Sequence, residues 1–146
     1  KSTDYEGGTR TPFIAHWPGV IDPGVTGQVG HLIDVSATFR EITGADYPRQ
    51  INGKRTKPPV GKSLLPIFQG RQREPHATLY WHFNKANAVR EGSLKAVRQG
   101  KAPWELYDLQ ADPTEMNDLA SERPEKVAEL AEKWEAWAKA CKERPE

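Results

Sequence analysis

Four short segments between residues 78 and 109 constrain the fold of this chain most. They are short candidate β-strands, and they comprise Thr78–Phe83, Asn87–Arg90, Leu94–Arg98 and Trp104–Leu109. The stretches between them are of turn length and contain Asn, Gly and Pro, which suit a reversal of the chain. Because such short connections join antiparallel neighbours, the pattern predicts a four-stranded antiparallel meander.

The C-terminal residues predict one long amphipathic helix. Pro124 stands at a first-turn position, where a missing N–H costs nothing. Apolar residues then recur at the three-and-four spacing of a single helical face, while Glu and Lys fill the opposite face. The apolar face consists of Val127, Leu130, Ala131, Trp134, Trp137, Ala138 and Cys141. We expect this helix to lie across the meander.

The residues before the meander predict fewer regular elements. Residues 1–8 read as a loop that ends in two glycines, Thr11–Trp17 as a short strand, and the apolar residues from Leu32 onward as a short helix that ends at Gly44. Residues 46–74 contain seven Lys or Arg against two acids and one apolar island, which is typical of a surface connection pinned at one point. We therefore expect an α+β chain in three parts, 1–45, 46–77 and 78–146.

The net charge and the lack of long apolar runs exclude several classes of partner. The chain has 146 residues, and 21 Lys and Arg against 20 Asp and Glu give a net charge of +1. That balance lacks the long-range field of a nucleic-acid or anionic-membrane binder, and no apolar run approaches the roughly eighteen residues of a membrane-spanning helix.

Because the chain begins with Lys1 rather than Met, and residues 3–8 read as the middle of an ordered element, we expect a fragment.

The residue types of catalytic and metal sites are sparse. The four histidines, His16, His31, His76 and His82, lie in unrelated local settings, so no nucleophile–base arrangement is recognisable. No histidine pair has metal-ligand spacing and no Asp-x-Asp cluster occurs, so we expect no metal site within this chain alone. The single cysteine, Cys141, excludes an internal disulfide, and we expect it to be a small buried hydrophobe on the last helix.

The most specific motif is the first nineteen residues, Lys-Ser-Thr-Asp-Tyr-Glu-Gly-Gly-Thr-Arg-Thr-Pro-Phe-Ile-Ala-His-Trp-Pro-Gly. It resembles the sulfatase pattern Lys-Gly-Thr-x-x-Glu-Gly-Gly-x-Arg-x-Pro, which is followed by an apolar strand and Trp-Pro-Gly. Three later stretches are similar to further sulfatase patterns, in the same order. They are Gly61–Pro66, Asn87–Lys95 and Trp104–Ala120. The resemblance spans residues 1 to about 120, with small departures at Val60 and Leu94.

This resemblance implies an alkaline-phosphatase-like hydrolase that cleaves sulfate esters. In that family a formylglycine, made from the Cys or Ser of a Cys-x-Pro-x-Arg type sequence, attacks the ester, and a divalent cation, commonly Ca²⁺ or Mg²⁺, neutralises the sulfate. Cys141 is followed by Lys-Glu-Arg-Pro and does not fit the precursor sequence. The resemblance therefore makes this chain the C-terminal third of such an enzyme, inactive alone, with residues 1–45 as the tail end of the large α/β catalytic domain.

The resemblance also assigns candidate site residues. Lys1 matches the lysine whose ammonium contacts the sulfate oxygens of the substrate, an aryl or carbohydrate sulfate. Thr3, Glu6 and Arg10 are expected to brace the loop that follows it by bonding main-chain atoms. No metal ligand is carried over to this chain, and the family favours a periplasmic or secreted location.

Several alternatives stay open. His16 and His82 are either ordinary packing residues or lie at the rim of the substrate pocket. The reaction could be that of a phosphatase or phosphotransferase of the same superfamily, or the chain could be a non-catalytic α+β module that binds carbohydrate or protein. The predicted strand 13–17 would leave an unpaired edge, so we expect residues 1–30 to be mobile or to self-associate, and residues 78–141 to form the protected unit.

Overall fold

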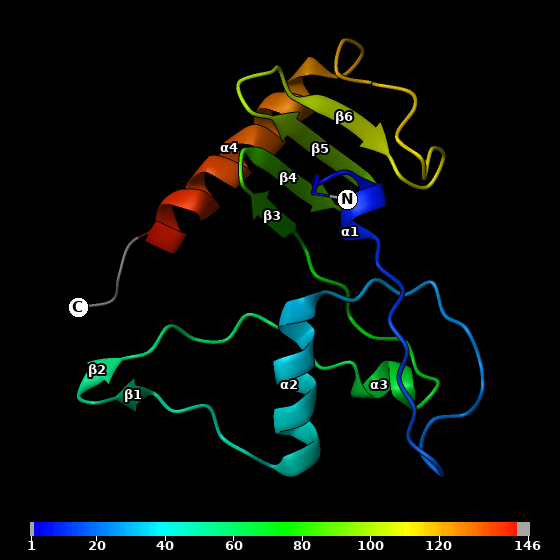
Figure 1. The fold of residues 1–146 in the computed structure, drawn as a ribbon, viewed down its shortest axis with the longest axis vertical. Coiled ribbons are helices and arrows are strands. Elements are labelled where there is room, and N and C mark those ends of the chain that lie inside the picture. The colour runs from blue at the N-terminus through cyan, green and yellow to red at the C-terminus, as the bar shows by residue number, and fades with distance from the viewer. Residues whose placement is uncertain (1, 143–146) are drawn as a thin grey trace. The chain divides into compact units, whose positions relative to one another are not determined.

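The computed structural model describes residues 2–142, which form two compact units (Figure 1). Residues 2–12 and 76–142 make up the first, here called the sheet unit, and residues 13–75 make up the second, the helix–loop unit. No helix in the described part of the chain is long and apolar enough to cross a lipid bilayer.

The sheet unit is built on the predicted antiparallel meander. Its strands follow each other in space as they do in sequence. They are β3 (Leu79–Phe83), β4 (Ala86–Glu91), β5 (Leu94–Gln99) and β6 (Glu105–Asp108). The connection from β4 to β5 is a tight turn in which Gly92 adopts φ 60°, a left-handed conformation that glycine tolerates without a Cβ clash. The prediction of a four-stranded meander is confirmed.

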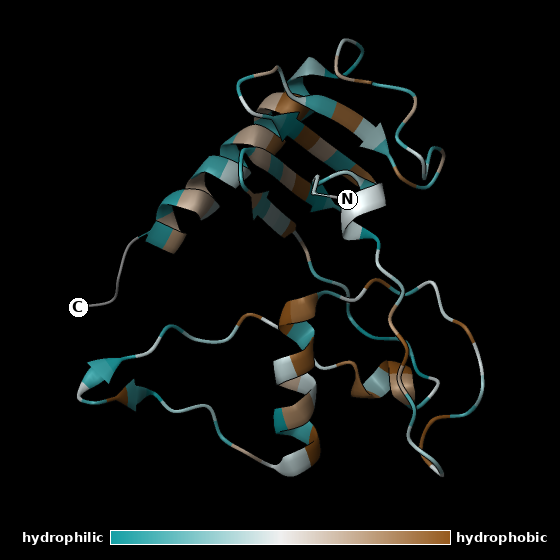
Figure 2. Ribbon diagram, viewed as in Figure 1, coloured by the Kyte–Doolittle hydropathy of each residue, from teal (hydrophilic) through white to brown (hydrophobic). Residues whose placement is uncertain are grey.

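The long helix α4 (Pro124–Lys142) covers one face of this sheet, as predicted. The strand register places Val89, Ala96 and Leu106 side by side, and they pack against Leu130 and Trp134 of the helix. The indole N–H of Trp134 donates to the carbonyl of Trp81 on the edge strand at 3.0 Å. Figure 2 shows hydrophobic and hydrophilic residues alternating along the strands of the sheet. This helix face therefore covers one face of the sheet with apolar side chains.

Cys141 departs from the expectation. It is exposed, although it continues the apolar spacing of the helix. The last turn of α4 extends beyond the edge of the sheet (Figure 1), which leaves the thiol of Cys141 exposed. Helical spacing identified the correct face of the helix but not where the sheet ends.

The opposite face of the sheet is covered by the N-terminal residues. Ala88, Val97 and Tyr107 form a second apolar cluster there, packed against Tyr5. Residues 1–8 were expected to be a loop, whereas residues Glu6–Thr9 form one helical turn, α1. The turn is stabilised from outside, because the backbone N–H of Glu6 donates to the carboxylate of Glu115.

The helix–loop unit contains α2 (Leu32–Thr43), the two-residue strands β1 (Gln50–Ile51) and β2 (Lys54–Arg55), and α3 (Leu65–Phe68). Helix α2 confirms the predicted helix, and Gly44 ends it in the left-handed conformation at φ 68°. The hairpin of β1 and β2 was not predicted, although Asn52-Gly53 is the strongest short hairpin signal, and both residues have positive φ.

The predicted strand at residues 13–17 does not form. Phe13 and Ile14 are exposed, Ile14 to 89%. A strand needs a neighbour for its ladder of hydrogen bonds, and no described segment of this chain pairs with these residues. The β-propensity of these residues is not enough to form a strand when no neighbouring strand pairs with them.

Candidate functional site

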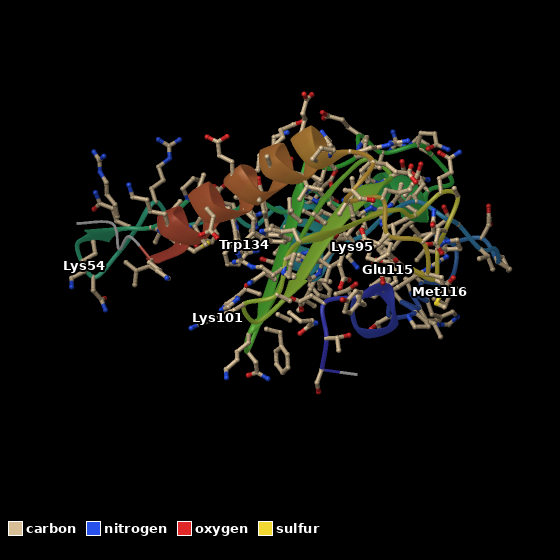
Figure 3. All side chains as sticks on the ribbon, turned by 90° about the horizontal axis from the view of Figure 1, so that it is seen from above. Lys54, Lys95, Lys101, Glu115, Met116 and Trp134 are labelled. Atoms are coloured by element: carbon tan, nitrogen blue, oxygen red, sulfur yellow. The ribbon has the colours of Figure 1, made fainter. Side chains whose placement is uncertain are left out.

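The candidate site is the N-terminal motif loop, residues 2–12, held on the face of the sheet opposite α4. Lys1, the predicted sulfate-contacting residue, lies outside the described residues. The structure therefore shows how the loop that follows Lys1 is anchored. Figure 3 labels Lys95 and Glu115, which lie on the side of the sheet where the N-terminal residues run.

Lys95 is the centre of the anchor. It is the second residue of β5, and its side chain is fully buried. Its ammonium lies 2.8 Å from Glu6 Oε1 and 3.3 Å from Thr9 Oγ1, and it forms an ion pair with Glu115 Oε1 at 3.0 Å without hydrogen-bond geometry. A buried charge needs such partners, because desolvation would otherwise cost several kcal/mol. The cluster joins the motif loop to the sheet and to the loop after β6.

Glu115 is held in place by its own turn. Its backbone has φ 57°, a left-handed conformation that is uncommon for a residue with a side chain. Asp112 fixes this turn, because its carboxylate accepts from the backbone N–H groups of Met116 and Asn117 at 2.7 and 2.8 Å. These bonds also lower the pKa of Asp112, with that to Asn117 the largest cause. The turn thereby aims a carboxylate at the motif loop.

A second contact fixes the loop through two phenols. Tyr5 and Tyr107 both donate to Glu105 Oε2, at 2.5 and 2.8 Å. Burial and the adjacent carboxylate raise the pKa of both phenols well above their ordinary value. Both hydroxyls therefore remain protonated donors at neutral pH.

Asp4 is the one carboxyl of the motif loop that is almost completely enclosed. It is 2% exposed, and its Oδ2 has no hydrogen-bond partner. Burial raises its pKa, opposed by the backbone N–H of Phe83 and by the nearby Lys95 and His82. Sequence reasoning did not single this residue out, because an Asp in a polar segment is usually solvated.

Gly8 explains the paired glycines of the motif. A Cβ at this position would lie 2.0 Å from the carbonyl oxygen of Thr3, whereas one at Gly7 would meet nothing within 4 Å. The predicted close backbone approach therefore falls on Gly8 and on Thr3. Any side chain at Gly8 would force the loop open.

The other predicted site residues fall in different settings. Arg10 has an exposed side chain, and its backbone N–H donates to the carbonyl of Glu6 at 2.8 Å. His82 lies in the sheet unit, where its Nδ1 is 2.8 Å from the side-chain amide of Asn87 and its ring meets Trp134 edge-on. His16 is exposed in the helix–loop unit. Within residues 2–142, no three His, Cys, Asp or Glu side chains converge in a way that could hold a metal ion.

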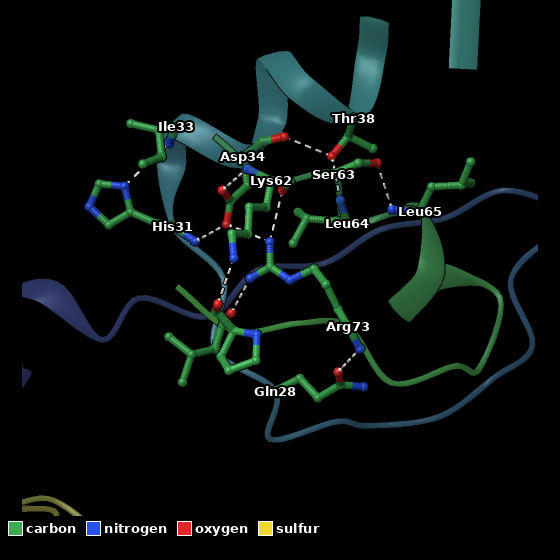
Figure 4. A network of polar contacts seen from close by, with 12 residues as sticks. Gln28, His31, Ile33, Asp34, Thr38, Lys62, Ser63, Leu64, Leu65 and Arg73 are labelled. Atoms are coloured by element: carbon green, nitrogen blue, oxygen red, sulfur yellow. Dashed lines mark hydrogen bonds and ion pairs between the residues drawn. The ribbon is translucent and has the colours of Figure 1, made fainter. Parts of the chain in front are cut away.

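A further polar cluster pins the connection in the helix–loop unit (Figure 4). Asp34, fully buried at the start of α2, accepts from the backbone N–H groups of His31 and Lys62 and from the guanidinium of Arg73 at 3.0 Å. Arg73 also donates to the carbonyls of Lys62 and Val29. The donors and acceptors are used within the protein, which gives this cluster a structural role.

The chain is similar to known sulfatases over most of its length. The family model described as N-sulphoglucosamine sulphohydrolase, C-terminal, matches residues 1–140. Arylsulfatase A of Bos taurus is 31% identical over 141 residues, covering 90% of this chain and 26% of the relative. N-acetylgalactosamine-6-O-sulfatase of Bacteroides thetaiotaomicron is 28% identical over 147 residues, covering 90% of this chain and 28% of the relative.

Two further relatives extend the comparison. The ulvan-active sulfatase of Formosa agariphila is 31% identical over 161 residues, covering 83% of this chain and 31% of the relative. A solved structure from work on glycosaminoglycan metabolism by Bacteroides thetaiotaomicron superposes with a TM-score of 0.77 at 28% identity, over 93% of this chain and 30% of that one. The chain thus spans roughly a quarter to a third of the proteins it matches.

Proposed function

The chain belongs to the sulfatase family, and from this premise we propose that it is the C-terminal part of an enzyme that hydrolyses sulfate esters of carbohydrates. The observation that carries the proposal is the motif loop, fixed on the sheet by the buried cluster of Lys95, Glu6 and Glu115. A loop anchored this firmly can present a charged residue with a defined geometry, which catalysis by charge stabilisation requires.

In this proposal Lys1 contacts the sulfate oxygens of the substrate. A compact ammonium matches the negative charge that develops on the sulfuryl group and on the leaving oxygen, and exclusion of water strengthens the attraction. Glu6 and Gly8 act on Lys1 indirectly: Glu6 ties the loop to Lys95, and Gly8 allows the backbone to fold tightly against Thr3.

The formylglycine nucleophile and the divalent cation of the proposed reaction come from outside this chain. The described residues do not fit either group, since they contain no cluster of metal ligands, and Cys141 is exposed at the end of α4 in the wrong sequence context. The isolated chain of 146 residues is therefore expected to hydrolyse no sulfate ester. Turnover of an aryl sulfate by the purified chain would contradict this.

The substrate class is proposed from the relatives. One is named for the 6-O-sulfate of N-acetylgalactosamine and another for activity on ulvan, whereas arylsulfatase A is named for aryl sulfates. Carbohydrate sulfates are the proposed physiological substrates, and aryl sulfates serve as convenient probes of the same chemistry.

The decisive experiment is a sulfate-release assay on the full-length protein that contains this chain. Lys1→Ala is expected to lower kcat/KM by roughly two to four orders of magnitude, as for loss of one charged transition-state contact. Lys101→Ala, an exposed residue of the sheet unit, is the matched control and should leave activity unchanged. A loss below about threefold in folded Lys1→Ala protein would remove Lys1 from the site. Preferential cleavage of the matching phosphate ester would instead indicate the phosphatase chemistry.

A further inference from the structure

The helix–loop unit concentrates positive charge in a chain that is otherwise nearly neutral. Residues 47–73 contain seven Lys or Arg and no Asp or Glu, while the whole chain has a net charge of only +1. This run includes the hairpin of β1 and β2 and the segment that follows it. A local excess of this size favours an anionic ligand at this surface.

Two of these seven residues, Arg49 and Arg55, line a cavity of about 580 Å³ between the end of α2 and the hairpin. Three arginines line it, and no carboxylate is among the described residues of its wall. The lining residues are Arg40, Tyr47, Arg49, Gln50, Arg55, Thr56, Pro58 and Pro59, which we call the arginine pocket. Its volume lies within the range of about 300–1,000 Å³ that is typical of small-ligand sites.

Several contacts fix the shape of the arginine pocket. Arg40 projects from the last turn of α2, and its guanidinium lies over the ring of Tyr47, 5.5 Å from the centroid. Across the mouth of the hairpin, the backbone N–H of Thr56 donates to the carbonyl of Arg49 at 3.0 Å, and its hydroxyl donates to the carbonyl of Pro48. The pocket is therefore formed by contacts within one unit.

Arg40 also carries an unused donor. Its Nε is enclosed and has no hydrogen-bond partner, whereas enclosed donors in folded proteins are usually satisfied. An anion in the pocket would supply an acceptor for arginine donors. The guanidinium group is suited to this, because its fork of N–H groups binds two oxygens of a tetrahedral anion at once.

We propose that the arginine pocket binds a non-reacting sulfate group of a sulfated polysaccharide, so that the polymer is held at a second point while another sulfate is cleaved. The inference rests on the proposed function, because it takes the substrate to be a carbohydrate with several sulfates. The described lining offers cationic and neutral hydrogen-bonding groups but no carboxylate or histidine, which suits binding and not acid–base chemistry.

A polysaccharide fits these observations better than a nucleic acid. Three arginines meet at one cavity, whereas nucleic-acid binders use an extended basic track that follows many phosphates. The overall charge of +1 is also too small for strong non-specific attraction of a polyanion. Recognition would therefore depend on the pocket itself.

The kinetic test uses the full-length protein with Arg40→Gln, Arg49→Gln and Arg55→Gln combined. The variant should raise KM for a polysulfated oligosaccharide by about tenfold or more, since charge-assisted hydrogen bonds are lost. kcat for that substrate, and both constants for a small aryl sulfate, should stay unchanged. An unchanged KM for the polysulfated substrate in folded variant protein would overturn the inference.

Two further variants control for charge and folding. Arg71→Gln, Lys85→Gln and Lys101→Gln together remove the same net charge outside the pocket and should leave KM unchanged. If this control raises KM equally, a general field explains the effect and the pocket is overturned. The double variant Arg49→Gln and Arg55→Gln leaves α2 intact, so it tests the pocket even if loss of Arg40 prevents folding.

A binding measurement separates this inference from the proposed function. Calorimetry with the Lys1→Ala full-length protein should show binding of the polysulfated oligosaccharide, no binding of its desulfated form, and loss of binding on removal of the three arginines. If the wild type cleaves no sulfate ester but this pattern holds, the proposed function fails and the pocket stands. If sulfate esters are cleaved while the arginine variant binds normally, the pocket fails alone. Equal binding of a single-stranded DNA of matched charge would overturn a preference for sulfated carbohydrate.

Discussion

The interactions that stabilise the sheet unit differ from those that stabilise the helix–loop unit. Of the twelve buried apolar residues described, ten belong to the sheet unit, and only Ala37 and Leu64 belong to the helix–loop unit. The sheet has apolar clusters on both of its faces in addition to the buried ion pairs of Lys95. The helix–loop unit depends mainly on the buried ion pair of Asp34 and Arg73 and on the bonds around it. An apolar core can repack after a small change in its side chains, whereas a buried charge is destabilising when one of its partners is lost.

This difference matches the proposed roles of the two units. The motif loop that follows Lys1 is tied to the unit with the larger apolar core, so the loop has a rigid support. The arginine pocket lies in the unit with few buried apolar residues, where polar contacts and the hairpin of β1 and β2 fix its shape. In this proposal one unit positions the residue that contacts the reacting sulfate, and the other unit binds a second part of the substrate.

Trp134→Ala should have the largest effect on stability. Its indole fills the centre of the apolar cluster between α4 and the sheet, so its removal should lower the free energy of unfolding by about 3–5 kcal/mol. We expect amide exchange to accelerate in α4 and in β3 to β6 together, while α2 keeps its protection. Melting of α4 with a protected sheet would show that this residue does not couple the two elements.

Lys95→Met should follow, with a cost of about 3–4 kcal/mol, because Glu6 and Glu115 would be left buried without a cation. Hydrogen exchange should locate the damage: the N–H groups of Gly8, Thr9 and Arg10, which donate to carbonyls of the motif loop, should lose protection first. The additional changes Glu6→Gln and Glu115→Gln should recover part of the stability. A variant as stable as the wild type would mean that the cluster is not an anchor.

The sequence predicted the elements whose signals are local. The meander followed from β-prone runs and short turns, and α4 from an uninterrupted apolar face. The strand at 13–17 failed because pairing requires a partner, which β-propensity does not reveal. The exposed end of α4 was missed for a related reason, since spacing along a helix does not show where its neighbour stops.

The anchor of the candidate site could not be predicted, because its members are far apart in sequence. Lys95 is separated from Glu6 by 89 residues, and a lysine in an alternating strand normally points to solvent. Only the docking of residues 2–12 on that face of the sheet turns Lys95 into a buried group. The hairpin at Asn52-Gly53, by contrast, had a recognisable local signal that was overshadowed by the basic and proline-rich composition around it.

Asp34→Asn tests the helix–loop unit in the same way and should cost about 2 kcal/mol. The isosteric amide removes the charge opposite Arg73 and replaces one acceptor oxygen by a donor. We expect faster exchange in α2 and in residues 61–73, with normal protection in β4 and β5. Loss of protection throughout the chain would show that the two units unfold together, which would contradict the distinction between them.

Glu91→Gln should have the smallest effect, because it concerns an ion pair at the surface of the sheet unit. Glu91 accepts from Lys126 and Lys133 of α4, and these bonds, that to Lys126 first, hold the pKa of Glu91 below its usual value. Exposure and side-chain entropy limit the stabilisation to less than about 1 kcal/mol.

The pH dependence of this pair has a defined sign. A carboxyl whose pKa is lower in the folded state stabilises the fold above its unfolded pKa, and this contribution is lost as the pH falls through the folded pKa. Denaturation of wild type and Glu91→Gln should therefore differ at neutral pH and converge in acid, and added salt should also reduce the difference. A gap that persists below the folded pKa would mean that Glu91 acts through packing and not through its charge.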